Sequence, residues 1–158
     1  MRYRRLLTAL LPLAFTACLS GAETITYPNI PIESTTFAAA LNVDLAASTK
    51  TSTGLYYREL TVGNGATATA SSRVSVYYGA FFANGQQFDG LVSPSAPYSF
   101  TLGTQTVIKG WEEGLVGMKV GGVRQLIVPP ALAYGSSGFQ AVPPNAVLVF
   151  TVTLAGVQ

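Results

Sequence analysis

The sequence predicts an α+β domain in which a curved antiparallel sheet of five to six strands wraps around one short α-helix. From Gly54 onwards, five separate segments read as strands, most of them with alternating residues, whereas a single segment of that part has the periodicity of a helix. Parallel strands need long crossover connections, which are usually helical, so one short helix cannot serve a parallel sheet. An antiparallel sheet curled around that helix buries the apolar faces of both elements.

The strand segments are separated by residues that favour turns. Gly63-Asn-Gly65 follows the first segment, and Asn84-Gly85 follows the second. Asn and Gly both tolerate a positive φ, which is why such dipeptides favour tight hairpins. The expected strands span residues 55–62, 73–82, 98–102, 123–128 and 147–154.

The expected helix covers residues 109–116. Glu112 and Glu113 lie in its first turn, where the helix dipole favours acidic side chains. Trp111 and Leu115 are four residues apart and define the face that packs. Gly114 weakens an isolated helix by up to about 1 kcal/mol, so packing has to hold it in place.

Residues 1–22 have the parts of a signal peptide. Three arginines precede a 12-residue apolar stretch, which is shorter than the roughly 20 residues of a membrane-spanning helix. Two processing routes remain open. The segment 15–18 resembles a bacterial lipobox in which Cys18 is lipidated, and small residues at 20–22 favour ordinary cleavage after Ala22. We expect export to the periplasm or cell envelope, with a lipid anchor at Cys18 preferred over free secretion.

The rest of the chain divides into residues 23–50, a tether or N-terminal extension, and residues 51–158, the folded domain. Phe37, Leu41 and Leu45 are spaced by four residues, which suits a short amphipathic helix. Such a helix would dock on the domain. A flexible stalk is the alternative interpretation.

The composition excludes several kinds of chemistry. The chain has no histidine and its single cysteine is Cys18, which excludes a Ser-His-Asp or Cys-His catalytic group and a zinc site of the usual kind. No glycine-rich phosphate-binding loop is present. Without the three leader arginines, six Lys and Arg face seven acidic residues, so no basic patch suits nucleic acid. We expect no metal and no cofactor.

Five motifs, taken in order and at their spacing, resemble the FKBP-type peptidyl-prolyl isomerases. The resemblance runs from about Gly54 to the C-terminus and implies the same fold independently. The motifs are Phe88-Asp89, Tyr98 to Gly103, Val107 to Gly114, Ala133-Tyr-Gly135, and Pro143-Pro144 with Val147 to Phe150.

The resemblance also implies a site. Trp111 would form the floor under a substrate proline, with aromatic walls around it, and the Ile108 N–H and Tyr134 hydroxyl would hold substrate carbonyl groups. Asp89 would orient Tyr77 or polarise the twisted carbonyl, and Phe139 would lie near the rim. The catalytic set is Tyr77, Asp89, Ile108 and Tyr134, and the substrate-binding set is Phe88, Tyr98, Val107, Trp111, Val142 and Phe150.

A prolyl isomerase needs no acid, base or metal, because rotation about an X-Pro bond makes and breaks no σ bond. The barrier of roughly 18–20 kcal/mol is the loss of amide resonance. An apolar pocket destabilises the polar planar amide relative to the twisted one. A thousandfold acceleration requires only about 4 kcal/mol. The predicted function is therefore prolyl isomerisation that assists the folding of exported proteins.

The predicted partners are proline-containing polypeptides, with macrolides as inhibitors, and the chain is expected to be a monomer. Two other functions stay open. The domain is a module that binds proline peptides or a partner protein with little catalysis, or it has a purely structural role in the envelope. An unused pocket disfavours the structural role because it exposes an apolar concavity.

Overall fold

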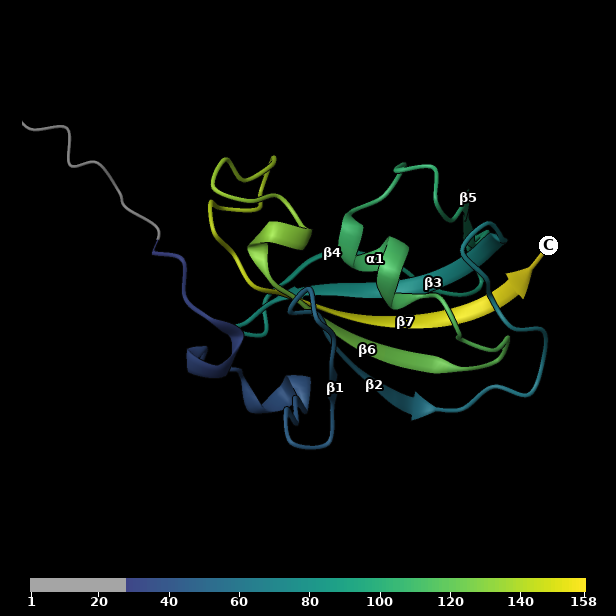
Figure 1. The fold of residues 1–158 in the computed structure, drawn as a ribbon, viewed down its shortest axis with the longest axis horizontal. Coiled ribbons are helices and arrows are strands. Elements are labelled where there is room, and N and C mark those ends of the chain that lie inside the picture. The colour runs from purple at the N-terminus through teal and green to yellow at the C-terminus, as the bar shows by residue number, and fades with distance from the viewer. Residues whose placement is uncertain (1–27) are drawn as a thin grey trace, which may run out of the picture.

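The computed structural model describes residues 28–158, which form one antiparallel sheet, one α-helix and three 3₁₀ helices (Figure 1). The strands are β1 (Thr49–Lys50), β2 (Tyr56–Thr61), β3 (Arg73–Phe82), β4 (Gln87–Leu91), β5 (Tyr98–Thr101), β6 (Val123–Val128) and β7 (Leu148–Val157). The helix is α1 (Lys109–Gly114), and the 3₁₀ helices are Ile32–Ser34, Ala39–Leu41 and Pro130–Leu132.

The predicted α+β architecture is confirmed, with seven strands in place of five or six. All five expected strands are present, and the sheet gains β1 and β4. β1 has two residues, too few for a periodic pattern. β4 contains Asp89 and Gly90, residue types that are depleted in strands, so its sequence does not indicate a strand. It forms through the hairpin at Asn84-Gly85, which pairs it with β3.

The two longest strands, β3 and β7, pair with each other. The strand order is β1-β2-β6-β7-β3-β4, and β5 also pairs with β3. β7 occupies one edge of β3 along most of its length. The other edge is shared, since β5 pairs with residues 73–76 and β4 with residues 78–81. Residues of β3 therefore lie beside both β4 and β5.

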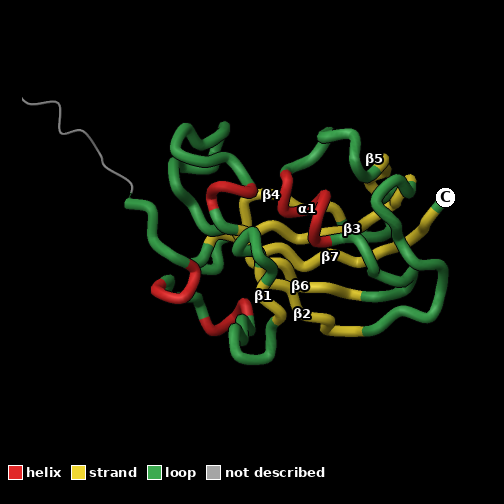
Figure 2. Tube along the Cα trace, viewed as in Figure 1, coloured by secondary structure: helices red, strands yellow, loops and turns green. Residues whose placement is uncertain are grey.

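Helix α1 packs on one face of this sheet (Figures 1 and 2). Val74, Val76 and Ala80 of β3 are fully buried there and share a core cluster with Trp111 and Leu115. Alternate residues of a strand point to the same face, so Tyr78 lies on this face as well. The opposite face carries Ser75, Tyr77, Gly79 and Phe81.

Contacts with β6 hold the short helix in position. A Cβ on Gly110 would lie 2.5 Å from a methyl group of Val128, so only glycine allows this close approach. At the other end, the buried Arg124 guanidinium donates to the Gly114 carbonyl oxygen at 2.6 Å and to the Val116 carbonyl oxygen at 3.0 Å. Arg124 thereby binds carbonyl groups that a helix C-terminus leaves without intrahelical partners. Helix α1 ends at Gly114 and is therefore shorter than the predicted range of residues 109–116.

The N-terminal extension covers the opposite face of the sheet. Ile32 and Leu41 are buried in a second apolar cluster with Tyr56, Ile127 and other residues of that face. The Gln125 side-chain amide donates to the Leu41 carbonyl oxygen at 2.8 Å. Described residues of the segment 28–50 thus pack against the sheet. Where residues 37–45 were expected to form a helix, the structure has the 3₁₀ helix Ala39–Leu41, which ends as the chain turns into the left-handed conformation at Asn42.

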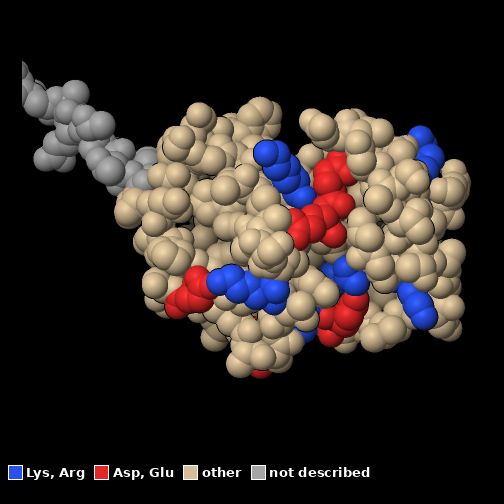
Figure 3. Space-filling view, in the orientation of Figure 1, with Lys and Arg blue, Asp and Glu red and all other residues tan. Residues whose placement is uncertain are grey.

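The predicted signal peptide at residues 1–22, including Cys18, lies outside the described residues. Within residues 28–158, no helix is long and apolar enough to cross a membrane. On the face shown in Figure 3, basic side chains are scattered over a largely uncharged surface.

Candidate functional site

A hollow of about 200 Å³ opens on the face of the sheet that carries α1. Strands β3, β4, β5 and β7 contribute to it, together with α1, the segment before α1 and the loop after Pro130–Leu132. We call it the proline pocket. Its lining residues are Tyr78, Phe88, Asp89, Tyr98, Thr106, Val107, Ile108, Trp111, Tyr134 and Phe150.

Trp111 forms the floor of the proline pocket. Its side chain is buried, and three aromatic rings surround it. The rings of Tyr78 and Phe150 meet the indole edge to face, with centroids at 5.0 and 5.5 Å, and Phe100 lies at 5.9 Å. Edge-to-face contacts of this kind stabilise aromatic pairs beyond the area they bury. The indole is therefore held in one orientation by its neighbours.

Two further aromatic pairs build the walls. Phe88 meets Phe150 edge to face at 6.2 Å, and Phe82 stacks on Phe88 at 4.6 Å with an interplanar angle of 27°. Tyr98, 41% exposed, lies at the rim with its ring 5.3 Å from that of Phe100. The floor of the pocket and these parts of its wall are therefore formed by aromatic rings.

One hydrogen-bonded pair supplies polarity at the wall. The Tyr78 hydroxyl donates to Oδ2 of Asp89 at 2.8 Å, and the Gly90 N–H donates to Oδ1 at 2.7 Å. Burial raises the pKa of Tyr78 well above its ordinary value, and the hydrogen bond to Asp89 raises it further. The phenol thus remains a donor at neutral pH. Between the described residues, no ion pair involves Asp89.

Two groups beside the floor are suited to hold a carbonyl oxygen. Ile108 is the N-cap of α1, and its backbone N–H is not needed for hydrogen bonding within the helix. Tyr134 stacks on Phe139, with ring centroids at 5.2 Å and an interplanar angle of 14°. Burial raises the pKa of Tyr134, and the negative charge of Asp89 adds to that effect. Its hydroxyl is therefore a donor at neutral pH.

The structure brings together every predicted site residue except Tyr77 and Val142. The catalytic and binding roles of these residues stay predictions. Tyr77 lies on the opposite face of β3, where its hydroxyl donates to the Ser95 carbonyl oxygen at 3.1 Å. The tyrosine beside Asp89 is Tyr78, which the sequence reasoning missed. The alternation along β3 contains the needed signal, because Val74, Val76 and Tyr78 share a face.

The predicted place of Val142 in the substrate-binding site is also corrected. It is 7% exposed and belongs to the main core cluster, and it does not line the proline pocket. Its backbone closes the flap, the loop of residues 137–147, through two hydrogen bonds with Phe139 of 2.8 and 2.9 Å. Thr106 lines the pocket and was not predicted. A single threonine in a loop forms no pattern from which a pocket residue can be predicted.

Comparison with known proteins agrees with this geometry. The sequence model of the FKBP-type peptidyl-prolyl cis-trans isomerases matches residues 64–155, more than half of the chain. The chain belongs to this family. The predicted family membership is therefore confirmed.

Several FKBP-type proteins are similar over the same region. FK506-binding protein 4 of Dictyostelium discoideum is 44% identical over 102 residues, which cover 64% of this chain and 28% of the relative. The crystal structure of FkpA from Escherichia coli has a TM-score of 0.65 at 40% identity and covers 71% of this chain and 52% of that one. A peptidyl-prolyl cis-trans isomerase from Pseudomonas syringae pv. tomato also has a TM-score of 0.65, at 30% identity, and covers 76% and 86%.

The chain spans about a quarter of the length of the Dictyostelium relative and about half of FkpA. The FKBP-type match begins at residue 64, so the extension 28–50 lies outside it. The similarity therefore concerns the domain that contains the proline pocket.

Proposed function

We propose that this FKBP-type domain catalyses cis-trans isomerisation of X-Pro bonds in polypeptides. The observation that carries the proposal is the proline pocket itself, an aromatic hollow floored by the buried Trp111. Family membership supports it, and so does the similarity to the peptidyl-prolyl cis-trans isomerase of Pseudomonas syringae pv. tomato.

The pocket accelerates rotation by removing the X-Pro amide from water. A planar amide is polar and is stabilised by water, whereas the twisted amide has lost its conjugation. Phe88, Trp111 and Phe150 offer an apolar surround in place of water, which disfavours the planar form. Rotation breaks no σ bond, so the pocket needs no general acid, base or metal.

The polar groups at the rim position the substrate. The Ile108 N–H and the Tyr134 hydroxyl hold substrate carbonyl groups and fix the chain on both sides of the rotating bond. Tyr78 positions the Asp89 carboxylate through their hydrogen bond. Asp89 then interacts with the carbonyl carbon of the twisted amide, where polarity changes during rotation.

From the predicted signal peptide we propose further that the chain acts on exported proteins. Its features are the basic start, the apolar stretch and the cysteine at position 18. A lipid anchor at Cys18 would retain the domain at the cell envelope. Mass spectrometry of the N-terminus of the protein isolated from its own cells tests this, with a diacylated Cys18 as the expected result. An unprocessed Met1 would contradict export.

A tetrapeptide containing one X-Pro bond tests the catalytic proposal. The rate of cis-trans exchange is measured by NMR with and without the full chain, in H₂O and in D₂O. We expect acceleration, with similar catalysed rates in the two solvents because no proton is transferred. A peptide that binds without acceleration would identify a binding module instead. A macrolide such as FK506, for which the Dictyostelium relative is named, is expected to compete for the same pocket.

A further inference from the structure

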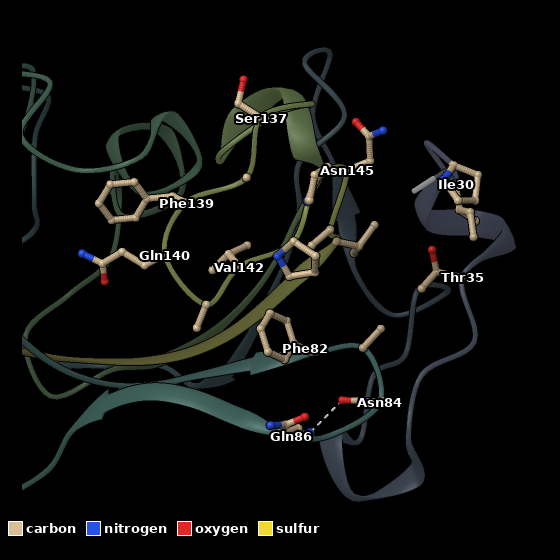
Figure 4. A pocket seen from close by; sticks show the side chains of 18 residues that line it. Ile30, Thr35, Phe82, Asn84, Gln86, Ser137, Phe139, Gln140, Val142 and Asn145 are labelled. Carbon is tan, nitrogen blue, oxygen red and sulfur yellow. Dashed lines mark hydrogen bonds between the residues drawn. The ribbon is translucent and has the colours of Figure 1, made fainter. Parts of the chain in front are cut away.

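A second hollow, much larger than the proline pocket, lies between the N-terminal extension, the β3–β4 hairpin and the flap. We call it the extension groove. Its volume is about 960 Å³. Figure 4 shows Ile30 and Thr35 of the extension on one side of the groove and Phe139 and Val142 of the flap on the other. Phe82 and Gln86 of the β3–β4 hairpin lie below them. The extension, which forms one wall of this groove, lies outside the residues that the family model matches.

The extension is fixed by residues close in sequence to Ile30 and Thr35, which line the groove. The Ala38 N–H donates to the Ala83 carbonyl oxygen at 2.8 Å, which ties the extension to the β3–β4 hairpin. At the tip of that hairpin, Gly85 has φ +87°, and a Cβ there would lie 3.0 Å from the Ala38 methyl group. Ile32 and Leu41 anchor the same segment in the second core cluster. The groove therefore has defined walls on the extension and hairpin sides.

The chemistry of the lining suits an uncharged, extended polypeptide. No charged residue is found among the described residues that line the groove. Apolar side chains such as Ile30 and Phe82 alternate around it with the amides of Asn84, Gln86 and Gln140. Amide side chains both donate and accept hydrogen bonds, as a peptide backbone requires. An anionic ligand would meet no basic side chain here.

The groove continues the proline pocket. A third hollow, of about 490 Å³, shares Val107, Ile108 and Tyr134 with the proline pocket and Phe139 with the extension groove. The stacked pair Tyr134–Phe139 therefore lies at the junction of all three hollows. On the other side, Phe82 lines the groove and stacks on Phe88 of the proline pocket. A polypeptide whose proline occupies the proline pocket can therefore continue past the pair Tyr134–Phe139 or past the pair Phe82–Phe88.

We propose that the extension groove binds the polypeptide segment that flanks the isomerised proline, in an extended and unfolded form. This proposal rests on the proposed prolyl isomerase function. Its consequence is that the domain prefers long unfolded chains over short proline peptides. The preferred flanking segment is uncharged and rich in aliphatic residues.

Peptide binding tests the proposal directly. Fluorescence anisotropy compares a labelled tetrapeptide containing X-Pro with two 12-residue peptides, which span up to about 40 Å when extended. One carries an uncharged aliphatic segment before the proline, and the other carries it after the proline. We expect at least one long peptide to bind about tenfold more tightly than the tetrapeptide, as the burial of one further aliphatic side chain implies. Equal affinities for all three would overturn the proposal.

Charge variants on opposite walls separate the groove from the pocket. Ile30→Glu changes the extension, and the nearly isosteric Gln86→Glu and Gln140→Glu change the hairpin and the flap. Val62→Glu, at a residue that is 73% exposed and outside the groove lining, is the matched control. We expect each groove variant to remove most of the gain from peptide length, whereas the tetrapeptide affinity and isomerisation rate stay at the wild-type value. A loss of tetrapeptide activity in the groove variants would overturn the separation of the two sites.

Two further measurements separate the groove proposal from the proposed catalysis and from self-association. If wild-type protein shows no tetrapeptide isomerisation yet binds the long peptide more tightly, the proposed catalysis fails, whereas binding of the segment beside the proline in the groove is retained. If Ile30→Glu changes the molecular mass measured by sedimentation equilibrium, the groove is a contact between copies of the chain, and the proposal fails.

Discussion

The alternation of residues along β3 leads to a sharp prediction for two neighbouring tyrosines. Tyr78→Phe removes the hydroxyl that donates to Asp89 at 2.8 Å, whereas Tyr77→Phe removes one that donates to the Ser95 carbonyl oxygen on the other face. The two variants make the same chemical change one residue apart. Only the first is expected to change catalysis.

The size of the effect follows from that hydrogen bond. A hydrogen bond to a charged group contributes about 1.5–3 kcal/mol when it is buried. Asp89 is exposed, so screening by water lowers this to about 1 kcal/mol. If that free energy positions Asp89 in the transition state, its loss lowers kcat/KM about fivefold. Tyr78→Phe is therefore expected to be about fivefold slower than wild type.

The assay is cis-trans exchange of a tetrapeptide containing X-Pro, measured for wild type and both variants at equal protein concentration. Thermal unfolding of each variant serves as the control for folding, because both substitutions keep the aromatic ring. A decrease in kcat/KM for Tyr77→Phe as large as that for Tyr78→Phe would refute the assignment of faces. So would an unchanged rate for Tyr78→Phe.

Three further substitutions test the contacts that hold α1 and the N-terminal extension on the sheet. Arg124→Met removes the side chain that binds the Gly114 carbonyl oxygen, and it is expected to lower the free energy of unfolding in urea by about 2 kcal/mol and to slow catalysis by loosening α1. Leu41→Ala should cost about 2 kcal/mol in the same measurement without changing tetrapeptide activity, since Leu41 lies on the opposite face. Glu33→Gln tests pH dependence, because hydrogen bonds from Lys50 and then Tyr56 lower the pKa of Glu33 from 4.5 to about 2. The stability that Glu33 contributes is thus present above pH 4.5 and lost as pH falls towards 2, so urea unfolding should distinguish variant from wild type at pH 6 and no longer at pH 2.

Much of the fold was predictable from sequence because the signals were local and periodic. Alternation marks β3 and part of β7, β6 is a short run rich in Val and Ile, and Trp111 with Leu115 marks the packed face of α1. β4 was not predictable in this way. Its pairing with β3 depends on the hairpin, and its own residues disfavour a strand.

The errors at the site have a common cause, which is the direction of side chains. The motif resemblance placed Tyr77 beside Asp89, whereas Tyr78 occupies that place in the structure. The period of a strand makes a shift of one residue a change of face. Val142 lies in the correct loop, yet its side chain points into the core. The extension groove was beyond prediction, because three segments distant in sequence form it.

The role of Trp111 as the floor of the proline pocket is tested most directly by Trp111→Leu. Leucine keeps the position apolar while it removes the ring that meets Tyr78, Phe100 and Phe150. Cis-trans exchange of the X-Pro tetrapeptide is measured for the variant and for wild type at a temperature where circular dichroism shows both to be folded. Catalysis by the aromatic pocket predicts a decrease in kcat/KM of about tenfold or more. A folded Trp111→Leu variant as fast as wild type would contradict it.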